Sequence, residues 1–237
     1  MLEEKKSAQA LTQVLNLEQM SGMHKYRLGL RELDAAVGSV SGGSGILIVG
    51  PPMSGKQAIV YSMVKQGLED GEGVILLPTM ETGENVLSSY ARFDNLRVID
   101  CMSRPLGMDA PDSAHIKLVN GPADLTGMGV WAGRLLDELK DKPVRLCIDS
   151  LSTLLMYSSL PVIFRFVHLL NGRIQTAGGL SVGVADEGMH DQKTMASLRQ
   201  LYRAALEIKE GENACYVRAA GLTPRPTPWF KFEEVIE

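Results

Sequence analysis

Residues 45–57 read GILIVGPPMSGKQ, and this stretch decides the fold class. Its first part, GILIVG, is a short apolar run that ends in glycine, a pattern typical of a buried strand. The segment that follows, AIVYSMVKQGLEDG, has apolar residues at helical spacing, and Gly67 or Gly71 can end the helix. The sequence therefore predicts a buried strand joined to a helix by a turn rich in glycine and proline.

This turn nearly matches the phosphate-binding pattern G-x-x-x-x-G-K-[ST]. In such a loop several backbone N–H groups point inward, and the helix behind it adds the positive end of its dipole. Lys56 would reach the β- and γ-phosphates of a nucleotide. The expected phosphate-binding residues are Gly50, Pro51, Pro52, Met53, Ser54, Gly55, Lys56 and Gln57.

The last residue of this loop departs from the pattern. Gln57 stands where Ser or Thr would place a hydroxyl on Mg²⁺. Because Mg²⁺ demands near-ideal geometry at short distance, we expect the longer amide side chain to weaken or displace the metal. Nucleotide binding through the loop amides and Lys56 would survive this change, whereas efficient hydrolysis would suffer.

Beyond the loop, apolar runs alternate with helical patterns. This alternation predicts an α/β fold with a mostly parallel sheet and helices on both faces. The last third predicts an antiparallel hairpin at the sheet edge, followed by an edge strand, and residues 104–124 predict a long surface loop. The predicted strands are 45–50, 73–78, 96–101, 144–150 and 179–186, the helices 58–71, 84–92, 125–141 and 159–174, the hairpin 203–220 and the edge strand 229–235.

Length and composition indicate one globular domain. Of the 237 residues, 45% are apolar and 22% charged, and the net charge of −4 argues against a nucleic-acid coat protein. Three well-separated cysteines fit a reducing compartment, and no signal peptide or membrane span is evident, so we expect a soluble cytoplasmic protein. We expect residues 1–24 to form a helical leader, packed on the domain or docked on a neighbouring subunit, and residues 25–237 to form the phosphate-loop domain.

Two carboxylates follow predicted strands. Asp149 ends the strand at 144–150, at the sheet edge where open α/β sheets bind ligands. It could hold Mg²⁺ through water, or it could cap the helix that follows. For Asp186 and Glu187, a solvated turn is the favoured interpretation over a polar sensor.

Taken together, these motifs resemble the KaiC-like branch of the RecA-like P-loop ATPases. The resemblance covers about residues 28–233, nearly the whole chain. The combination of ordered motifs is specific, although each short piece alone is weak. The residues that carry it are GLRELD at 29–34, GGSG at 42–45, the loop at 50–56, IDSLS at 148–152 and YVRA at 216–219.

The resemblance implies an ATP-binding core that assembles into a homo-oligomer, often a hexameric ring, with nucleotide at the subunit interfaces. It implies a catalytic glutamate at Glu81, where Met80 replaces the second member of the usual glutamate pair; a helix-entry carboxylate is the alternative. It also implies that Arg218 reaches the neighbouring subunit's γ-phosphate, with Tyr216 in place of the family's lysine. The alternative for Arg218 is a solvated strand residue.

The three departures, Gln57, Met80 and Tyr216, each remove a polar group from one site. They favour a protein that binds ATP or ADP, hydrolyses it weakly or not at all, and serves as a regulatory or signalling module with a protein partner. One alternative is an active RecA- or RadB-like ATPase in DNA recombination or repair, against which the acidic charge balance argues. Another is a structural ring subunit that binds no nucleotide.

Overall fold

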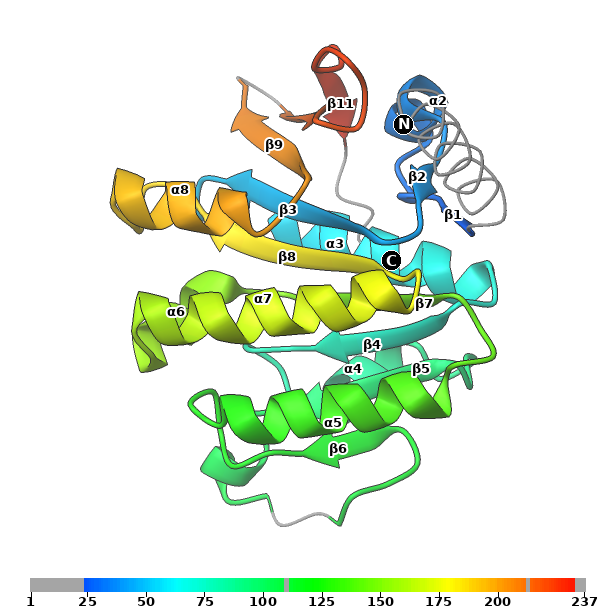
Figure 1. Ribbon diagram of the computed structural model, residues 1–237, viewed down its shortest axis with the longest axis vertical. Coiled ribbons are helices and arrows are strands. Elements are labelled where there is room, and N and C mark those ends of the chain that lie inside the picture. Colours follow the sequence, from blue (N-terminus) through cyan, green and yellow to red (C-terminus); the bar gives the residue numbers. More distant parts are fainter. Residues whose placement is uncertain (1–23, 109–110, 212–213, 233–237) are drawn as a thin grey trace, which may run out of the picture.

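The computed structural model describes residues 24–108, 111–211 and 214–232. Its centre is a nine-stranded sheet with the strand order β11-β10-β9-β3-β8-β7-β4-β5-β6 (Figure 1). The strands from β9 to β6 in this order run parallel, whereas β10 and β11 are antiparallel additions at one edge. The strands are β3 (Ser44–Gly50), β4 (Gly73–Leu77), β5 (Leu96–Asp100), β6 (Ile116–Leu118), β7 (Val144–Ile148), β8 (Leu180–Asp186), β9 (Ala204–Glu210), β10 (Cys215–Ala220) and β11 (Phe230–Phe232).

Helices cover both faces of this sheet (Figure 1). Ile46 and Ile48 of β3 pack into the core on the α3 side, and their neighbours Leu47 and Val49 pack into the core on the α7 side. Burial on both faces explains why the central strands are continuous apolar runs rather than alternating ones. The first face carries α2 (Arg31–Val37), α3 (Lys56–Glu69) and α4 (Gly83–Ser89), and the second carries α5 (Leu125–Glu138), α6 (Leu151–Tyr157), α7 (Leu160–Thr176) and α8 (Gln192–Gln200).

This arrangement confirms the expected α/β, RecA-like class with a C-terminal antiparallel hairpin, formed by β9 and β10. No helix among the described residues is both long and apolar enough to cross a bilayer. The helical leader expected over residues 1–24 lies, apart from its last residue, outside the described residues.

Several short elements of secondary structure were not predicted from the sequence. The segment 104–124, expected to be a loop throughout, contains a 3₁₀ turn (Arg104–Leu106) and the edge strand β6. Three residues are too few to show an alternating pattern, and β6 is a strand because it pairs with β5. The helices α2, α6 and α8, and a small separate sheet of β1 (Lys25–Tyr26) and β2 (Val40–Ser41), were also not predicted.

The motif GLRELD at 29–34 has a structural explanation. The carboxylate of Asp34 accepts hydrogen bonds from the backbone N–H groups of Leu28, Gly29 and Leu30 at 2.7–3.1 Å. Gly29 has a φ of 78°, and a Cβ there would lie 2.6 Å from the carbonyl oxygen of Ser62 in α3. The motif therefore fixes the segment before β3 closely against α3.

A buried ion pair joins β7 to the segment after α3. The side chains of Arg145 and Glu72 are both fully buried, with Nε 2.8 Å from Oε2 and Nη2 2.9 Å from Oε1. The guanidinium also donates to the carbonyl oxygens of Met63 and Arg27, so it is held on several sides. Local sequence pattern does not predict this pair, because its partners lie 73 positions apart.

Candidate functional site

The turn between β3 and α3 has the backbone of an anion-binding loop. Met53 and Gly55 both adopt positive φ, 59° and 76°, and Gly55 opens α3 directly before Lys56. Among the described residues, no acceptor takes a hydrogen bond from the backbone N–H of Gly55, Lys56 or Gln57. These donors lie at the positive end of a 14-residue helix, the usual setting for an anion.

The side chain of Lys56 is folded into this loop. It is only 1% exposed, donates to the carbonyl oxygen of Pro51, and lies 3.5 Å from Oγ of Ser54. Its Nζ atom also lies 2.8 Å from Oδ1 of Asp186. The amino group expected to reach a phosphate is therefore bound to protein, although the backbone donors beside it remain open.

Asp186 owes this position to the sheet register. It is the last residue of β8 and pairs with Gly50, the last residue of β3. The next residue, Glu187, donates its backbone N–H to the carbonyl oxygen of Gly50 at 2.8 Å. A purely solvated turn, the interpretation favoured from the sequence, is therefore wrong for Asp186, because its carboxylate holds the loop lysine. The position of Asp186 at the end of a predicted strand was the one hint of this role in the sequence. Its pairing with Lys56 depends on the register that places β8 beside β3.

Asp149 directly follows β7 at the same edge of the sheet and is almost completely buried. It accepts hydrogen bonds from the backbone N–H of Thr79 at 2.9 Å and from its hydroxyl at 2.7 Å. Burial raises the pKa of Asp149 to about 6, although the two bonds from Thr79 oppose the shift. The helix that follows is capped by the neighbouring Ser150, which accepts from the N–H of Thr153, and not by Asp149 itself.

Glu81 lies in the segment between β4 and α4, close to Asp149. Its exposed carboxylate accepts a hydrogen bond from the hydroxyl of Tyr61 in α3 at 3.2 Å. Burial and the nearby carboxylates of Asp149 and Glu81 together raise the pKa of Tyr61 above its usual value. Met80, beside Glu81, is 68% exposed. The fold thus brings the Glu81 carboxylate near Asp149.

Arg218 is held within its own chain. Its guanidinium lies 2.7 Å from Oε2 of Glu207, its partner across the β9–β10 hairpin, and 4.5 Å from the ring centroid of Trp229. Although burial acts to raise it, hydrogen bonds from Arg218 and Arg199 hold the pKa of Glu207 below its usual value. A role for Arg218 toward a neighbouring subunit stays a prediction, and so does the catalytic role of Glu81.

Phe232, which was not predicted to belong to the site, forms one wall of the phosphate loop. A Cβ on Gly55 would lie 3.1 Å from two ring atoms of Phe232 in β11. The C-terminal edge strand therefore places an aromatic ring against the start of α3. Nothing in the sequence indicates this contact, because it depends on the order of strands in the sheet.

The described residues offer few ligands for a metal. Among them, no group of three or more His, Cys, Asp or Glu side chains is arranged to hold an ion. Asp149 already accepts two hydrogen bonds from Thr79, and Gln57 supplies only a neutral amide. This donor set fits Mg²⁺ poorly, since the ion binds through carboxylates and needs an octahedral arrangement.

Comparison of the fold with solved structures defines its class. The structure is similar to a KaiC-like protein of the archaeon Pyrococcus horikoshii, with a TM-score of 0.64 and 16% identity over 89% of this chain and 95% of that one. It is also similar to an uncharacterized protein of the same organism, crystallised with an unknown peptide, with a TM-score of 0.65 and 14% identity over 88% and 100% of the two chains. At these identities the likeness shows the fold, which is RecA-like and shared with KaiC-like proteins.

A family model also matches most of this chain. Residues 43–208 match a family of unknown function, DUF7504, and the chain belongs to that family. A comparison with curated proteins gave no match. The matched region runs from just before β3 to β9, so it includes the phosphate loop, Asp149 and Asp186.

Proposed function

We propose that this protein binds ATP or ADP at the β3–α3 loop and hydrolyses it weakly or not at all. It would serve as a regulatory or signalling module of the KaiC-like type. The observation that carries the proposal is the loop itself: Gly55 in the left-handed conformation, open N–H donors at the start of α3, and Lys56 inside the loop. Loops with this geometry bind phosphates.

Binding requires that Lys56 exchange partners. An incoming phosphate competes with the carboxylate of Asp186 for the lysine, and the displaced carboxylate would face a second negative charge. Part of the binding free energy therefore goes into breaking the ion pair. This supports a modest affinity and a conformational change at the end of β8 when the nucleotide enters.

Weak hydrolysis follows from the same set of residues. Gln57 removes the hydroxyl that would hold Mg²⁺, Met80 removes a carboxylate beside Glu81, and Asp186 adds a negative charge next to the lysine. A bound Mg²⁺ would neutralise charge on the phosphates. Gln57 and Asp149 would be the residues to hold it, but Gln57 offers only a neutral amide and Asp149 is already hydrogen-bonded to Thr79.

Calorimetric and thermal-unfolding titrations with ATP and ADP, each with and without Mg²⁺, test the proposal. A ligand at 100 times its Kd stabilises the folded state by about 2.7 kcal/mol, which is easily measured. We expect a shift for the wild type that changes little when Mg²⁺ is removed, and no shift for Lys56→Ala. Absence of a shift in the wild type would overturn nucleotide binding.

A second function is favoured by one observation. The pair of Lys56 with Asp186 closes the loop internally, as expected of a structural subunit that binds no nucleotide. Such a protein would still form a homo-oligomer through the scaffold of its fold. Light scattering with and without nucleotide separates the two functions, because only a nucleotide-binding module changes its assembly or stability on addition of ATP or ADP.

A further inference from the structure

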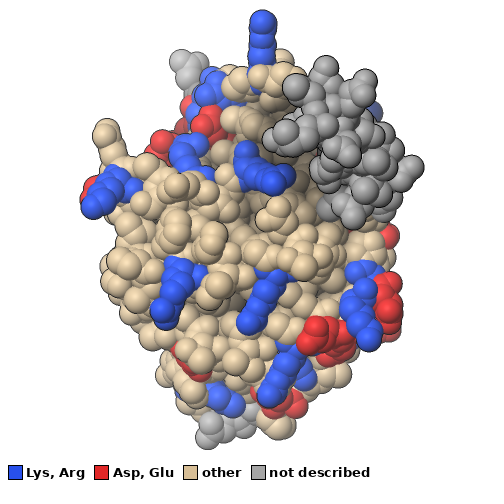
Figure 2. All heavy atoms as spheres, viewed as in Figure 1, with Lys and Arg blue, Asp and Glu red and all other residues tan. Residues whose placement is uncertain are grey.

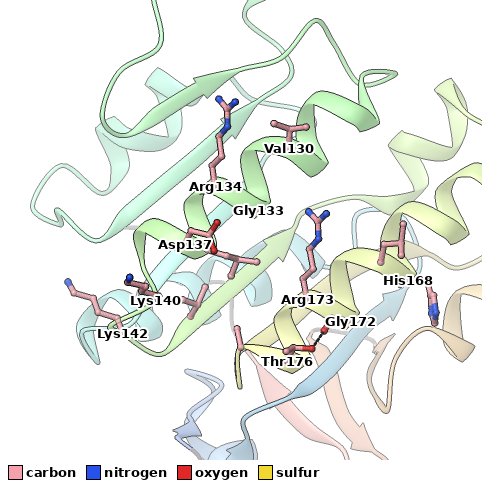
Figure 3. Close-up of a pocket in the computed structure, with 14 residues that line it drawn as sticks. Val130, Gly133, Arg134, Asp137, Lys140, Lys142, His168, Gly172, Arg173 and Thr176 are labelled. Atoms are coloured by element: carbon pink, nitrogen blue, oxygen red, sulfur yellow. Dashed lines mark hydrogen bonds between the residues drawn. The ribbon is translucent and has the colours of Figure 1, made fainter.

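A large hollow on the described surface lies away from the phosphate loop. It is a groove between α5 and α7 with a volume of about 940 Å³, and a second hollow of about 320 Å³ adjoins it (Figure 3). The two hollows share Val130, Leu169 and Arg173, so they form one continuous feature. We refer to it as the α5–α7 groove.

The shape of the groove suits an elongated partner. The two helices lie side by side on the outer face of the sheet (Figure 1), and with 14 and 17 residues they are about 21 and 26 Å long. Glycines keep the groove open: Gly133 and Gly172 line it, and a Cβ on Gly172 would meet no atom within 4 Å. A third helix of about four turns would match this length.

The groove exposes apolar side chains that a folded domain normally covers. Leu169 is 61% exposed, Val130 48% and Val162 45%, and all three line the groove. Isolated exposed apolar residues need no explanation, but a contiguous set beside a hollow is typical of a binding surface. The apolar strip therefore needs a partner with apolar side chains along one face.

The charge of the groove is opposite to that of the chain. Five cations and a single carboxylate, Asp137, line the two hollows, although the whole chain has a net charge of −4. Figure 2 shows this face of the molecule: in its middle Lys and Arg side chains stand over an uncharged surface, and at the lower right Asp and Glu lie beside other cations. The five cations are Arg134, Lys140, Lys142, Arg165 and Arg173.

These cations have no carboxylate partner in the described part of the chain. Arg134 stacks on the ring of Trp131, and Arg173 donates to the carbonyl oxygen of Gly129, but neither forms an ion pair there. Elsewhere on the surface cations do pair with acids, as Arg92 does with Glu69 and Arg97 with Glu138. The positive charge of the groove is therefore not neutralised within the described chain, and it would attract a negatively charged partner.

We propose that the α5–α7 groove binds an acidic amphipathic helix of a partner protein. Its apolar residues, spaced i, i+3, i+4 and i+7, would fill the hollow beside Val130 and Leu169, and its carboxylates would face the five cations. The site lies on the face of the sheet opposite α3, so this inference does not depend on nucleotide binding.

A selection from a displayed library of random 16-residue peptides tests this inference with the full-length protein. Peptides are enriched on the wild type after depletion on Gly172→Phe, a variant whose ring would occupy the open space of the groove. We expect enriched peptides with net negative charge and helical apolar spacing. A synthetic peptide from this pool should bind at least tenfold more weakly to Gly172→Phe and to Arg165→Glu.

Matched controls keep the test decisive. Gly172→Ala introduces a side chain at the same helical position without filling the groove, and Arg203→Glu reverses an exposed charge outside the residues that line it. Both should bind the peptide as the wild type does, and thermal unfolding shows whether every variant is folded. Enrichment of neutral or basic peptides, no peptide that distinguishes the wild type from Gly172→Phe, or equal weakening by Arg203→Glu would overturn the proposal. So would duplex DNA or anionic vesicles that bind with the same dependence on Gly172→Phe.

Discussion

Nζ of Lys56 lies 2.8 Å from Oδ1 of Asp186, across the two parallel strands that end side by side at the phosphate loop. The lysine is 1% exposed and the carboxylate 17%, so water screens this pair only in part. The pair places a negative charge where the proposed nucleotide would bring its phosphates. If the loop binds an anion as proposed, we expect Asp186 to lower its affinity.

Replacement of Asp186 by asparagine should act in opposite directions on binding and stability. We expect ADP to bind about tenfold more tightly, because Lys56 no longer pairs with a carboxylate and the negative charge that repels the phosphates is removed. The free energy of unfolding without nucleotide should fall by about 2 kcal/mol, since Lys56 stays buried without its partner. Calorimetry and urea denaturation measure the two effects. Glu187→Gln, which removes the exposed neighbouring charge, is the control, and equal or weaker ADP binding by Asp186→Asn would refute this role.

Restoration of the hydroxyl at position 57 tests whether the site is degenerate. In Gln57→Thr we expect the affinity for ATP to rise several-fold in Mg²⁺ and to stay unchanged in EDTA, because threonine supplies the missing metal ligand. Steady-state phosphate release should increase in the same variant. Addition of Lys56→Ala should abolish both gains. Robust turnover by the wild type in Mg²⁺, lost in Lys56→Ala, would contradict the interpretation that the site is impaired.

Asp149 should make stability depend on pH. Its pKa in the folded state, about 6, lies above the ordinary value of 3.8, so the folded protein holds this proton more tightly than the unfolded chain. Its stabilising contribution is therefore present below pH 4 and is lost as the pH rises through 6. Relative to Asp149→Asn, which can still accept from Thr79, the wild type should lose about 2 kcal/mol of unfolding free energy between pH 4.5 and 7.5. Urea denaturation at both pH values measures the difference, and a constant difference would show that Asp149 does not titrate in this range.

The buried pair of Arg145 with Glu72 should be sensitive to loss of one partner. Arg145→Met leaves the Glu72 carboxylate buried without its counter-ion, and we expect the unfolding free energy to fall by about 3–5 kcal/mol. The double variant Arg145→Met with Glu72→Leu should be more stable than this single variant, because no charge remains buried alone. Arg92→Met, which breaks an exposed pair with Glu69, should cost less than about 1 kcal/mol. A double variant less stable than Arg145→Met would contradict the view that the unpaired Glu72 carboxylate causes the loss of stability.

Local pattern was enough to predict the fold class and the position of the loop. Continuous apolar runs, each followed by a helical period, predict buried parallel strands, and GPPMSGKQ specifies a turn from strand to helix without reference to any distant residue. Pattern also predicted that Asp149 lies at the carboxyl edge of the sheet, whereas Glu81 was singled out only by the resemblance.

The partners of these residues were decided only by the tertiary structure. The pairing of Lys56 with Asp186 depends on β8 lying beside β3, the contact of Phe232 with Gly55 depends on the order of the edge strands, and Arg145 meets Glu72 across 73 positions. The α5–α7 groove likewise exists only because two helices that are separate in the sequence pack on one face of the sheet. Strand order and register bring distant residues together, and neither leaves a mark in local periodicity or composition.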